Sequence, residues 1–361
     1  MITTDVLEQI LDVGRWAPSG DNTQPWRFEI AAPDHVVVHG FDTRAHCVYD
    51  LDGHPSQIAI GALIETITIA ASAYGLRVDV RRRENAPENR PTIDLRFAKD
   101  ASVVASPLIS AIKARTVQRR PMRTVPLTEA QTSALSDVVG PGYELIWYSS
   151  LVDRWRVARI MFRNAKARLI MEEAFEVHRS VIEWGSRYSE DRIPDQAIGL
   201  DPMTMKLMRW VMKSWSRVEF MNKWLAGTVM PRVQLDLVPG LACAAHVGLV
   251  SRAPLVSIDE YVAAGRVVQR FWLEATRLGL MLQPEMTPVI FGRYCREGRK
   301  FTTNARAEGL ARQVESEFKT LVGADRAARV AFFARTGSGR EPRSRSLRLP
   351  VSRLGRWQEL D

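Results

Sequence analysis

The apolar positions of this chain alternate between helical and strand periodicity along its length. Residues 4–16 carry apolar side chains at helical spacing and predict a short helix that ends before Pro18. Residues 128–138 and 151–176 also predict helices, and Thr128 has the features of an N-cap. Strand-like alternation occurs in three segments, residues 27–30, 78–97 and 143–149. The chain therefore mixes both element types in close succession.

Two long apolar segments, residues 58–76 and 261–280, predict buried central helices that resemble one another. They align without a gap at an offset of 204 residues, with four identical pairs over the sixteen positions from residue 61 to 76: Gly61 with Gly265, Ala71 with Ala275, Gly75 with Gly279, and Leu76 with Leu280. Each is followed by an extended segment, residues 78–97 and 281–291. A helix–strand repeat is one interpretation, and chance similarity between two amphipathic helices is the other.

Charge and cysteine content narrow the classes of protein that fit this pattern. The 361 residues include 50 Lys and Arg against 41 Asp and Glu, which gives a net charge of +9. The three cysteines are far apart without a CxxC motif, so we expect neither a disulfide scaffold nor a structural zinc site. No basic leader and no uncharged apolar run of spanning length occurs, so we expect a cytoplasmic protein without a membrane partner.

The arginines are concentrated in three segments, residues 81–83, 115–123 and 335–356. No RNA-binding aromatic pattern, helix-turn-helix signature or zinc finger accompanies them, so we expect no nucleic-acid partner. A bound cofactor that carries a phosphate is the alternative explanation. The Gly, Ser, Arg and Pro content of residues 337–356, taken alone, predicts a disordered basic tail.

Two further patterns leave alternatives open. Residues 203–230 form a basic amphipathic segment rich in Met and Trp, which fits a core helix, a membrane-surface helix or a mobile lid over a flat aromatic ligand. His35 and His39 share one face of a predicted strand near His46 and Cys47. A metal site would need a distant partner that is not evident, so we predict surface histidines and no metal.

The loop of residues 17–24 carries the most chemical information. Ser19 to Thr23 form a polar turn, and Gln24-Pro25-Trp26 leads into a strand. Its backbone N–H groups and amide side chains suit the pyrimidine edge of a heterocycle, while Pro18 and Trp26 offer flat apolar surface. An ordinary Pro-Ser-Gly turn is the alternative.

The run APSGDNTQPWRF at residues 17–28 resembles the flavin-contacting motif of the FMN-dependent nitroreductase-like family. Residues 111–122, AIKARTVQRRPM, are similar to the arginine-rich phosphate-binding segment of that family, and residues 266–283 to its helix ending in Leu-Gly-Leu. In ordinary members the arginine motif precedes the Pro-Ser motif, whereas here it follows. The chain therefore resembles the internally duplicated branch, which includes Acg-type proteins and modules associated with ThiF-type adenylating enzymes.

The resemblance implies an α+β fold of two fused nitroreductase-like copies, forming a pseudo-dimer around antiparallel sheets with a helical lid insertion. It places the first half at residues 1–105 with the Pro-Ser loop and the second at 106–361 with the arginines. The lid would be residues 166–240 and a basic C-terminal arm residues 335–361. We expect one FMN site, an empty second pseudo-site, and either a pseudo-dimeric monomer or a homodimer. Asp50, Asp52, Gly53 and His54 resemble the polar loop before the family's helix, with a capping role rather than a metal role.

Carried over by position, the resemblance implies these cofactor-binding residues: Pro18, Ser19, Gly20, Asn22, Gln24, Arg115, Thr116, Arg119, Arg120, Pro284, Glu285, Arg343 and Arg345. The arginines would hold the phosphate or the flavin N1/O2 edge. The backbone of residues 284–286 would lie near flavin N5, with the Glu285 side chain free to face solvent. The lid would supply the substrate pocket with Trp210, Met212 and Trp215.

The implied function is an FMN-dependent oxidoreductase that passes hydride through flavin N5 between NAD(P)H, or a substrate, and a flat apolar small molecule. No protein nucleophile is required. No GxGxxG, P-loop or GxSxG motif occurs, so NAD(P)H would have to bind in the flavin pocket itself. The alternatives are an FMN-binding or sequestering protein without NAD(P)H turnover, and a redox module that acts with an adenylating partner enzyme.

Overall fold

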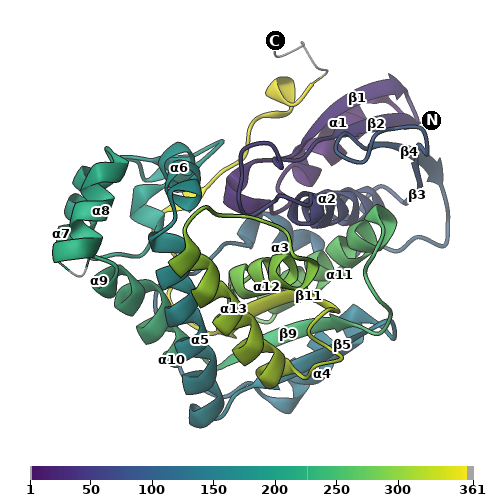
Figure 1. The fold of residues 1–361 in the computed structure, drawn as a ribbon. Coiled ribbons are helices and arrows are strands. Elements are labelled where there is room, and N and C mark those ends of the chain that lie inside the picture. The colour runs from purple at the N-terminus through teal and green to yellow at the C-terminus, as the bar shows by residue number, and fades with distance from the viewer. Residues whose placement is uncertain (1, 226, 356–361) are drawn as a thin grey trace.

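The computed structural model describes residues 2–225 and 227–355, which form an α+β fold with two four-stranded antiparallel sheets (Figure 1). The first sheet contains β1 (Trp26–Ala32), β2 (His35–Gly40), β4 (Thr92–Lys99) and β3 (Leu76–Arg82), in that spatial order. The second contains β5 (Tyr143–Tyr148), β9 (Ala245–Ser251), β11 (Val330–Gly337) and β10 (Met281–Pro284).

The two sheets share one topology. Counted along the chain within each unit, the strands lie in the order 1-2-4-3, and a long helix follows the second strand. This helix is α2 (His54–Ser72) in the first unit and α11 (Ile258–Arg277) in the second. The second unit also holds two additions, one between β5 and β9 and one, α12 (Thr287–Glu297) with α13 (Ala305–Val322), between β10 and β11.

The helices α2 and α11 pack against each other through a reciprocal glycine contact. A Cβ added at Gly61 would lie 2.0 Å from the Val262 carbonyl oxygen, and one added at Gly265 would lie 2.1 Å from the Ile58 carbonyl oxygen. Both contact pairs obey the offset of 204 residues predicted by the sequence alignment. This is the pattern that a twofold axis produces, in which residue i meets j and the equivalent of j meets the equivalent of i.

The helix ends also match the sequence prediction. Thr128 forms a capping box with Gln131 at the start of α4 (Glu129–Val139), as expected from its N-cap pattern. Gly75 and Gly279, which are equivalent in the alignment, follow α2 and α11 with φ of 63° and 72°. A left-handed conformation is accessible to Gly without a steric penalty, so both helices can turn sharply into the next strand.

Each sheet packs on its own hydrophobic core. The first sheet is covered on one face by α1 (Thr4–Gly14) and α2. The second is covered on one face by α4 and α11 and on the other by α5 (Leu151–Leu169), α12 and α13. Residues 287–291 are therefore helical, and the predicted extended segment over residues 281–291 ends at Pro284. Pro288 lies in the first turn of α12, where its missing N–H has no helical partner to lose.

The addition between β5 and β9 is a peripheral helical layer, at the left of Figure 1. It contains α6 (Glu172–Val181), β6 (Ile182–Glu183), β7 (Tyr188–Ser189), β8 (Ile193–Pro194), α7 (Pro202–Val211), α8 (Trp215–Trp224), α9 (Val229–Arg232) and α10 (Val238–Leu241). None of the residues of α7 is buried, so the core-helix interpretation of this segment is wrong for α7. No helix in the described part of the chain is long and apolar enough to cross a membrane.

The basic C-terminal segment packs against this layer. β12 (Arg345–Ser346) pairs in parallel with β7, and Leu349 and Leu354 belong to the core of the first sheet. A free, disordered tail is therefore wrong for residues 345–354, because apolar side chains anchor them. Residues 356–361 of the predicted arm lie outside the described residues.

Candidate functional site

Four segments from distant parts of the chain meet at one place, which we call the junction. They are residues 17–24, 115–120, 186–200 and 343–349. The first segment follows α1, the second follows α3 (Ile109–Ala114), the third lies in the peripheral layer, and the fourth contains β12. The structure thus brings the Pro-Ser loop, the arginine segment and the C-terminal arm together.

The Pro-Ser loop is held in a sterically demanding conformation. Asp21, Asn22 and Gln24 have φ of 49°, 64° and 48°, in the left-handed region that non-glycine residues rarely adopt. The Ser19 hydroxyl oxygen accepts a hydrogen bond from the Gln24 backbone N–H at 2.9 Å and closes the loop. Pro18 and Ser19 are half-buried, whereas Gly20 is exposed. Such backbone strain persists only where surrounding contacts fix it.

Those surrounding contacts come from the other junction segments. The Asn22 amide nitrogen donates to the carbonyl oxygens of Glu190 and Arg192, at 3.1 and 3.3 Å. The Gln24 amide donates to the Glu190 carbonyl at 2.9 Å and accepts from the Leu349 backbone N–H at 2.9 Å. The Asn22 side-chain oxygen is buried without a partner. Both predicted amide side chains therefore tie the loop down, and one acceptor atom remains available.

Three arginines form a cluster at the junction, in which Arg115 and Arg348 are buried and Arg345 is half-buried. Arg115 donates to the Trp16 carbonyl oxygen at 2.9 Å, and its guanidinium lies 4.6 Å from the Trp272 ring centroid. Arg345 donates to the Arg115 carbonyl oxygen at 3.1 Å, and Arg348 donates to the Ala17 carbonyl oxygen at 2.9 Å. In the described part of the chain, none of the three forms an ion pair with a carboxylate. Sequence reasoning had missed Arg348, which lies three residues beyond Arg345.

The electrostatics of this arginine cluster favour an anion. Burial, together with the charges of Arg348 and Arg345, lowers the pKa of Arg115 well below its usual range. Burial also lowers the pKa of Arg348 to about 9, with Arg345 and Arg15 contributing. The Nε atoms of Arg115 and Arg345 are buried without an acceptor. Unpaired buried charge is costly, and a bound phosphate would offset that cost by accepting hydrogen bonds from several guanidinium groups.

Arg119 and Arg120 face the peripheral layer. Arg119 donates to the Ala197 carbonyl oxygen at 3.4 Å and Arg120 to the Gln196 carbonyl oxygen at 3.0 Å. Burial lowers the pKa of Arg119 to about 10, although the charge of Asp21 opposes this shift. Thr116 is half-buried in the same segment. Arg119 therefore lies near Asp21 of the loop and does not belong to the Arg115 cluster.

A second polar group beside the loop was not predicted. The Tyr49 hydroxyl and His178 Nε2 are 3.0 Å apart, and burial, with the charge of Arg168, lowers the pKa of His178 to about 3. Arg168 also lies 3.4 Å from an Asp236 carboxylate oxygen, and burial raises the pKa of Asp236 to about 6. His178 is therefore neutral near pH 7, and burial raises the pKa of Tyr49, so the two side chains form a neutral hydrogen-bonded pair. These residues are too far apart in the sequence for any spacing rule to detect them.

Glu285 belongs to a fully buried ion-pair network. Its carboxylate lies 2.7 Å from His246 Nδ1 and 3.0 Å from the Arg335 guanidinium. Its backbone N–H donates to the Phe333 carbonyl oxygen at 2.8 Å, and Pro284 pairs with Ala334 in the second sheet. The expectation of a solvent-facing Glu285 side chain is wrong, because two cationic side chains hold it in the core. Arg335 also donates to the Arg119 carbonyl oxygen at 2.8 Å and so links this network to the junction.

The remaining predicted site residues lie away from the loop. Trp210 is 44% exposed in α7, Met212 ends that helix, and Trp215 packs 5.6 Å from the ring of Phe175. Arg343 is exposed, and its carbonyl oxygen accepts from Arg187. No hydrogen bond or ring contact in the described residues links these side chains to residues 17–24.

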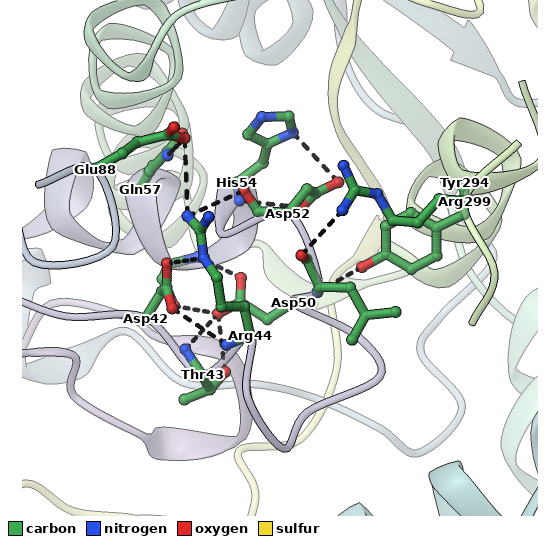
Figure 2. Close-up of polar contacts among 12 residues, drawn as sticks. Asp42, Thr43, Arg44, Asp50, Asp52, His54, Gln57, Glu88, Tyr294 and Arg299 are labelled. Atoms are coloured by element: carbon green, nitrogen blue, oxygen red, sulfur yellow. Dashed lines mark hydrogen bonds and ion pairs between the residues drawn. The ribbon is translucent and has the colours of Figure 1, made fainter. Parts of the chain in front are cut away.

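The histidines and acidic residues of the first unit have structural roles. His35 pairs with Asp94 and His39 with Glu29, at 2.8 and 2.9 Å, and no group of metal-ligating residues occurs in the described part of the chain. Figure 2 shows the polar loop before α2. Asp50 accepts hydrogen bonds from the Ser56 backbone N–H and hydroxyl, which confirms its capping role.

The same loop fastens the first unit to α12 of the second. The Leu51 backbone N–H donates to the Tyr294 hydroxyl oxygen at 2.8 Å, and Arg293 contacts an Asp52 carboxylate oxygen at 2.6 Å. His54 stacks on Tyr261 with ring centroids 3.7 Å apart. In the same loop, Arg44 lies between Asp42 and Glu88 and forms ion pairs with both (Figure 2). The loop therefore acts as a clamp between the two units.

Comparison with known proteins finds one family profile and relatives that match only in part. Residues 1–55 match the profile of the nitroreductase family. The chain is 31% identical over 147 residues to a Mycobacterium tuberculosis protein provisionally named NAD(P)H nitroreductase acg, covering 38% of this chain and 44% of that protein. It is 24% identical over 277 residues to the uncharacterized M. tuberculosis protein MT1398, covering 76% of this chain and 37% of that protein. The chain thus spans less than half the length of either relative.

Solved structures with distant similarity carry nitroreductase names. They include a nitroreductase-like family protein from Bacillus cereus (12% identity, TM-score 0.35, 72% of this chain and 100% of that chain). Another is an FMN-bound nitroreductase from Bacteroides fragilis (11% identity, TM-score 0.32, 65% of this chain and 89% of that chain). A third is the FMN-dependent nitroreductase NfnB from Mycobacterium smegmatis in complex with NADPH (12% identity, TM-score 0.34, 69% of this chain and 96% of that chain). With TM-scores below 0.5, we base no argument on these likenesses.

Proposed function

We propose that this chain is an FMN-dependent oxidoreductase with one cofactor site, located at the junction. The observation that carries the proposal is the cluster of buried Arg115 and Arg348 with half-buried Arg345, which has no carboxylate partner among residues 2–225 and 227–355 and lies beside the amide-rich loop. This donor set fits a phosphate-bearing heterocycle, since guanidinium groups bind phosphate oxygens and amides recognise ring edges. The family match over residues 1–55 includes the whole loop.

The chain's own residues would bind and orient the cofactor. The arginine cluster would hold the phosphate, and the free Asn22 side-chain oxygen would accept a hydrogen bond from a ring N–H. Bound FMN would supply hydride transfer through its N5 atom. The name of the Acg relative supports NAD(P)H as the reductant.

The equivalent topology of the two units supports an origin by fusion of two copies. Each copy would then contribute one part of the site, the loop from the first and the arginines from the second. The second pseudo-site would be empty, because the segment before β5 contains α4 and a short turn in place of a Pro-Ser loop. We therefore infer about one FMN per chain.

A second candidate function is FMN storage without NAD(P)H turnover. Residues 190–192 and Leu349 cover the loop and occupy its amide groups, which favours restricted access to anything bound beneath. An adenylating partner enzyme that supplies or receives electrons would be compatible with the same restriction. Bound FMN that NADPH cannot reduce anaerobically, in a chain that retains about one FMN, would favour these alternatives over the reductase.

The proposal is tested by measuring FMN affinity for matched arginine variants. Arg115→Ala and Arg345→Ala should each weaken FMN binding by about tenfold or more, because each removes a charged phosphate donor. Arg343→Ala is the control, since that side chain is exposed and has no hydrogen bond among the described contacts. Fluorescence quenching of FMN gives the dissociation constant, and circular dichroism checks folding. Equal affinity in all three folded variants would remove the junction as the FMN site.

A further inference from the structure

The helices α7 and α8 each carry two apolar faces. In each helix, one face packs against the rest of the protein and the other is exposed. On α7, Met205 and Met208 pack against the small core of Ile182, Ile198 and Leu200. The opposite side presents Met203, Leu207 and Trp210, spaced four and three residues apart, which places them on one helical face. Met203 is 82% exposed and Trp210 44% exposed. An apolar helix face is normally buried, and this face of α7 has no partner among the residues that the structure describes.

The helix α8 repeats this arrangement. Val218 and Met221 are buried on its inner face, whereas Phe220 and Trp224 are exposed on the other side, Trp224 by 66%. The exposed apolar surface continues after the helix with Leu225, Val229 and Met230. α7 and α8 form the outer edge of the molecule, away from both sheets (Figure 1). We call the exposed side chains of residues 203–230 the outer face.

The outer face is bordered by positive charge. Residues 202–230 contain five basic residues, Lys206, Arg209, Lys213, Arg217 and Lys223, and one acidic residue, Glu219. Arg217 is half-buried, and its guanidinium lies 4.7 Å from the Trp210 ring centroid. The other four basic side chains are exposed. A surface with exposed Trp, Phe, Leu and Met between Lys and Arg is complementary to a partner that is apolar inside and negative at its boundary.

We propose that the outer face binds the surface of an anionic lipid bilayer. Trp and Phe would enter the interfacial region, and the Lys and Arg side chains would contact lipid phosphates. The expectation of no membrane partner rested on the lack of a spanning segment, and surface binding needs none. This interaction is independent of the proposed flavin chemistry.

Charge makes a second copy of this chain a poor partner for the same surface. A twofold contact brings each face against its own copy, so the excess of basic residues would oppose an identical excess. Like charges that lose water on contact are unfavourable, whereas anionic headgroups neutralise them. Charge complementarity therefore selects the bilayer over self-association.

The test is sedimentation of the full chain with vesicles of phosphatidylcholine alone or of phosphatidylcholine with phosphatidylglycerol. We expect binding to the anionic vesicles that weakens as salt is raised, and much weaker binding to phosphatidylcholine. The double variants Trp210→Ser/Trp224→Ser and Lys206→Glu/Lys223→Glu should each lower the partition coefficient by about tenfold or more. Trp155→Ser in α5 is the matched control, because that Trp is 46% exposed outside this layer.

Two results would overturn the proposal. One is binding to anionic vesicles that both double variants retain at the level of the unchanged chain. The other is a lack of vesicle binding by the unchanged chain, with light scattering showing an oligomer that the Trp variant dissociates, because the outer face would then be a protein interface. Circular dichroism of each variant shows that the layer remains folded.

Discussion

The two units share one strand order, yet they bury different amounts of their sheets. In the first unit, β3 and β4 alternate buried and exposed positions, which is typical of a sheet with one face toward solvent. In the second unit, β9 and β11 are buried at every position, because helices cover both faces. The difference shows that one strand order can form a sheet with one solvent-facing side or a sheet covered on both faces. The pattern of apolar side chains along the strands decides between the two.

The additions that cover the second sheet also make the molecule functionally asymmetric. The peripheral layer contributes Glu190 and Arg192 to the loop of the first unit. The arginine segment and Arg345 come from the second unit and its C-terminal extension. The two units therefore contribute different segments to one junction.

The largest change in stability should come from substitutions at the glycine contact between α2 and α11, which joins the two units. Gly61→Ala and Gly265→Ala should each destabilise the fold by about 3 kcal/mol or more, because the new Cβ would meet a backbone carbonyl that can move only with its helix. If the contact is reciprocal, the two losses should be similar. Urea unfolding followed by circular dichroism gives both free energies.

The matched control for this pair is Gly309→Ala in α13. A Cβ there would meet nothing within 4 Å, so the better helix propensity of Ala should leave stability unchanged or raise it by about 1 kcal/mol. A large loss at Gly61 with none at Gly265 would contradict the twofold arrangement of the two helices.

A smaller effect should appear in the pH dependence of stability, and it belongs to the second unit alone. Burial would lower the pKa of His246, but the Glu285 carboxylate and the neighbouring Cys243 raise it to about 10. The folded chain therefore keeps a proton that the unfolded chain releases near its ordinary pKa of about 6.5. This stabilisation is complete below about pH 6.5 and is lost as pH rises toward 10.

Thermal unfolding at pH 7 and pH 9 measures this loss, which we expect to be about 1 to 2 kcal/mol in unfolding free energy. His246→Gln should be less stable at pH 7 and should show a flatter pH profile, because it cannot carry the charge that faces Glu285. An unchanged slope in this variant would assign the pH dependence to another group.

The smallest effect should come from the surface contact between the units. Arg82 in β3 forms a two-point ion pair with Asp259 in α11, at 2.7 and 2.8 Å, and both side chains reach solvent. Solvent screens such pairs, so Arg82→Ala should lower the free energy of unfolding by less than about 1 kcal/mol. Chemical denaturation at low and high salt checks this, and a loss comparable to that of Gly61→Ala would show that charge, rather than close packing, joins the units.

The sequence predicted the elements whose side-chain pattern repeats locally. The central helices, the strands of the first unit and the cap at Thr128 follow from periodicity and from short-range hydrogen bonds, whereas the capping role of Asp50 followed from the family resemblance. These features depend on residues close in the chain, so a single sequence contains enough information for them.

The parts that the sequence did not predict depend on contacts between distant segments. Tyr49 and His178 meet only because the peripheral layer folds back onto the first unit, and Arg168 links this pair to Asp236. The burial of Glu285 needs His246 and Arg335 from two other strands. The resemblance to nitroreductases located the loop and Arg115, but it did not show that the amides of the loop hold the chain's own carbonyl groups.

Those amide contacts also set the order in which the molecule can assemble. Gln24 is joined to Glu190 and to Leu349, which follow it by 166 and 325 residues. During synthesis, the loop therefore cannot reach its final conformation until the chain up to Leu349 has left the ribosome. A cofactor that needs the loop in this conformation can bind only after that point, so its binding follows the folding of segments that are synthesised much later than the loop.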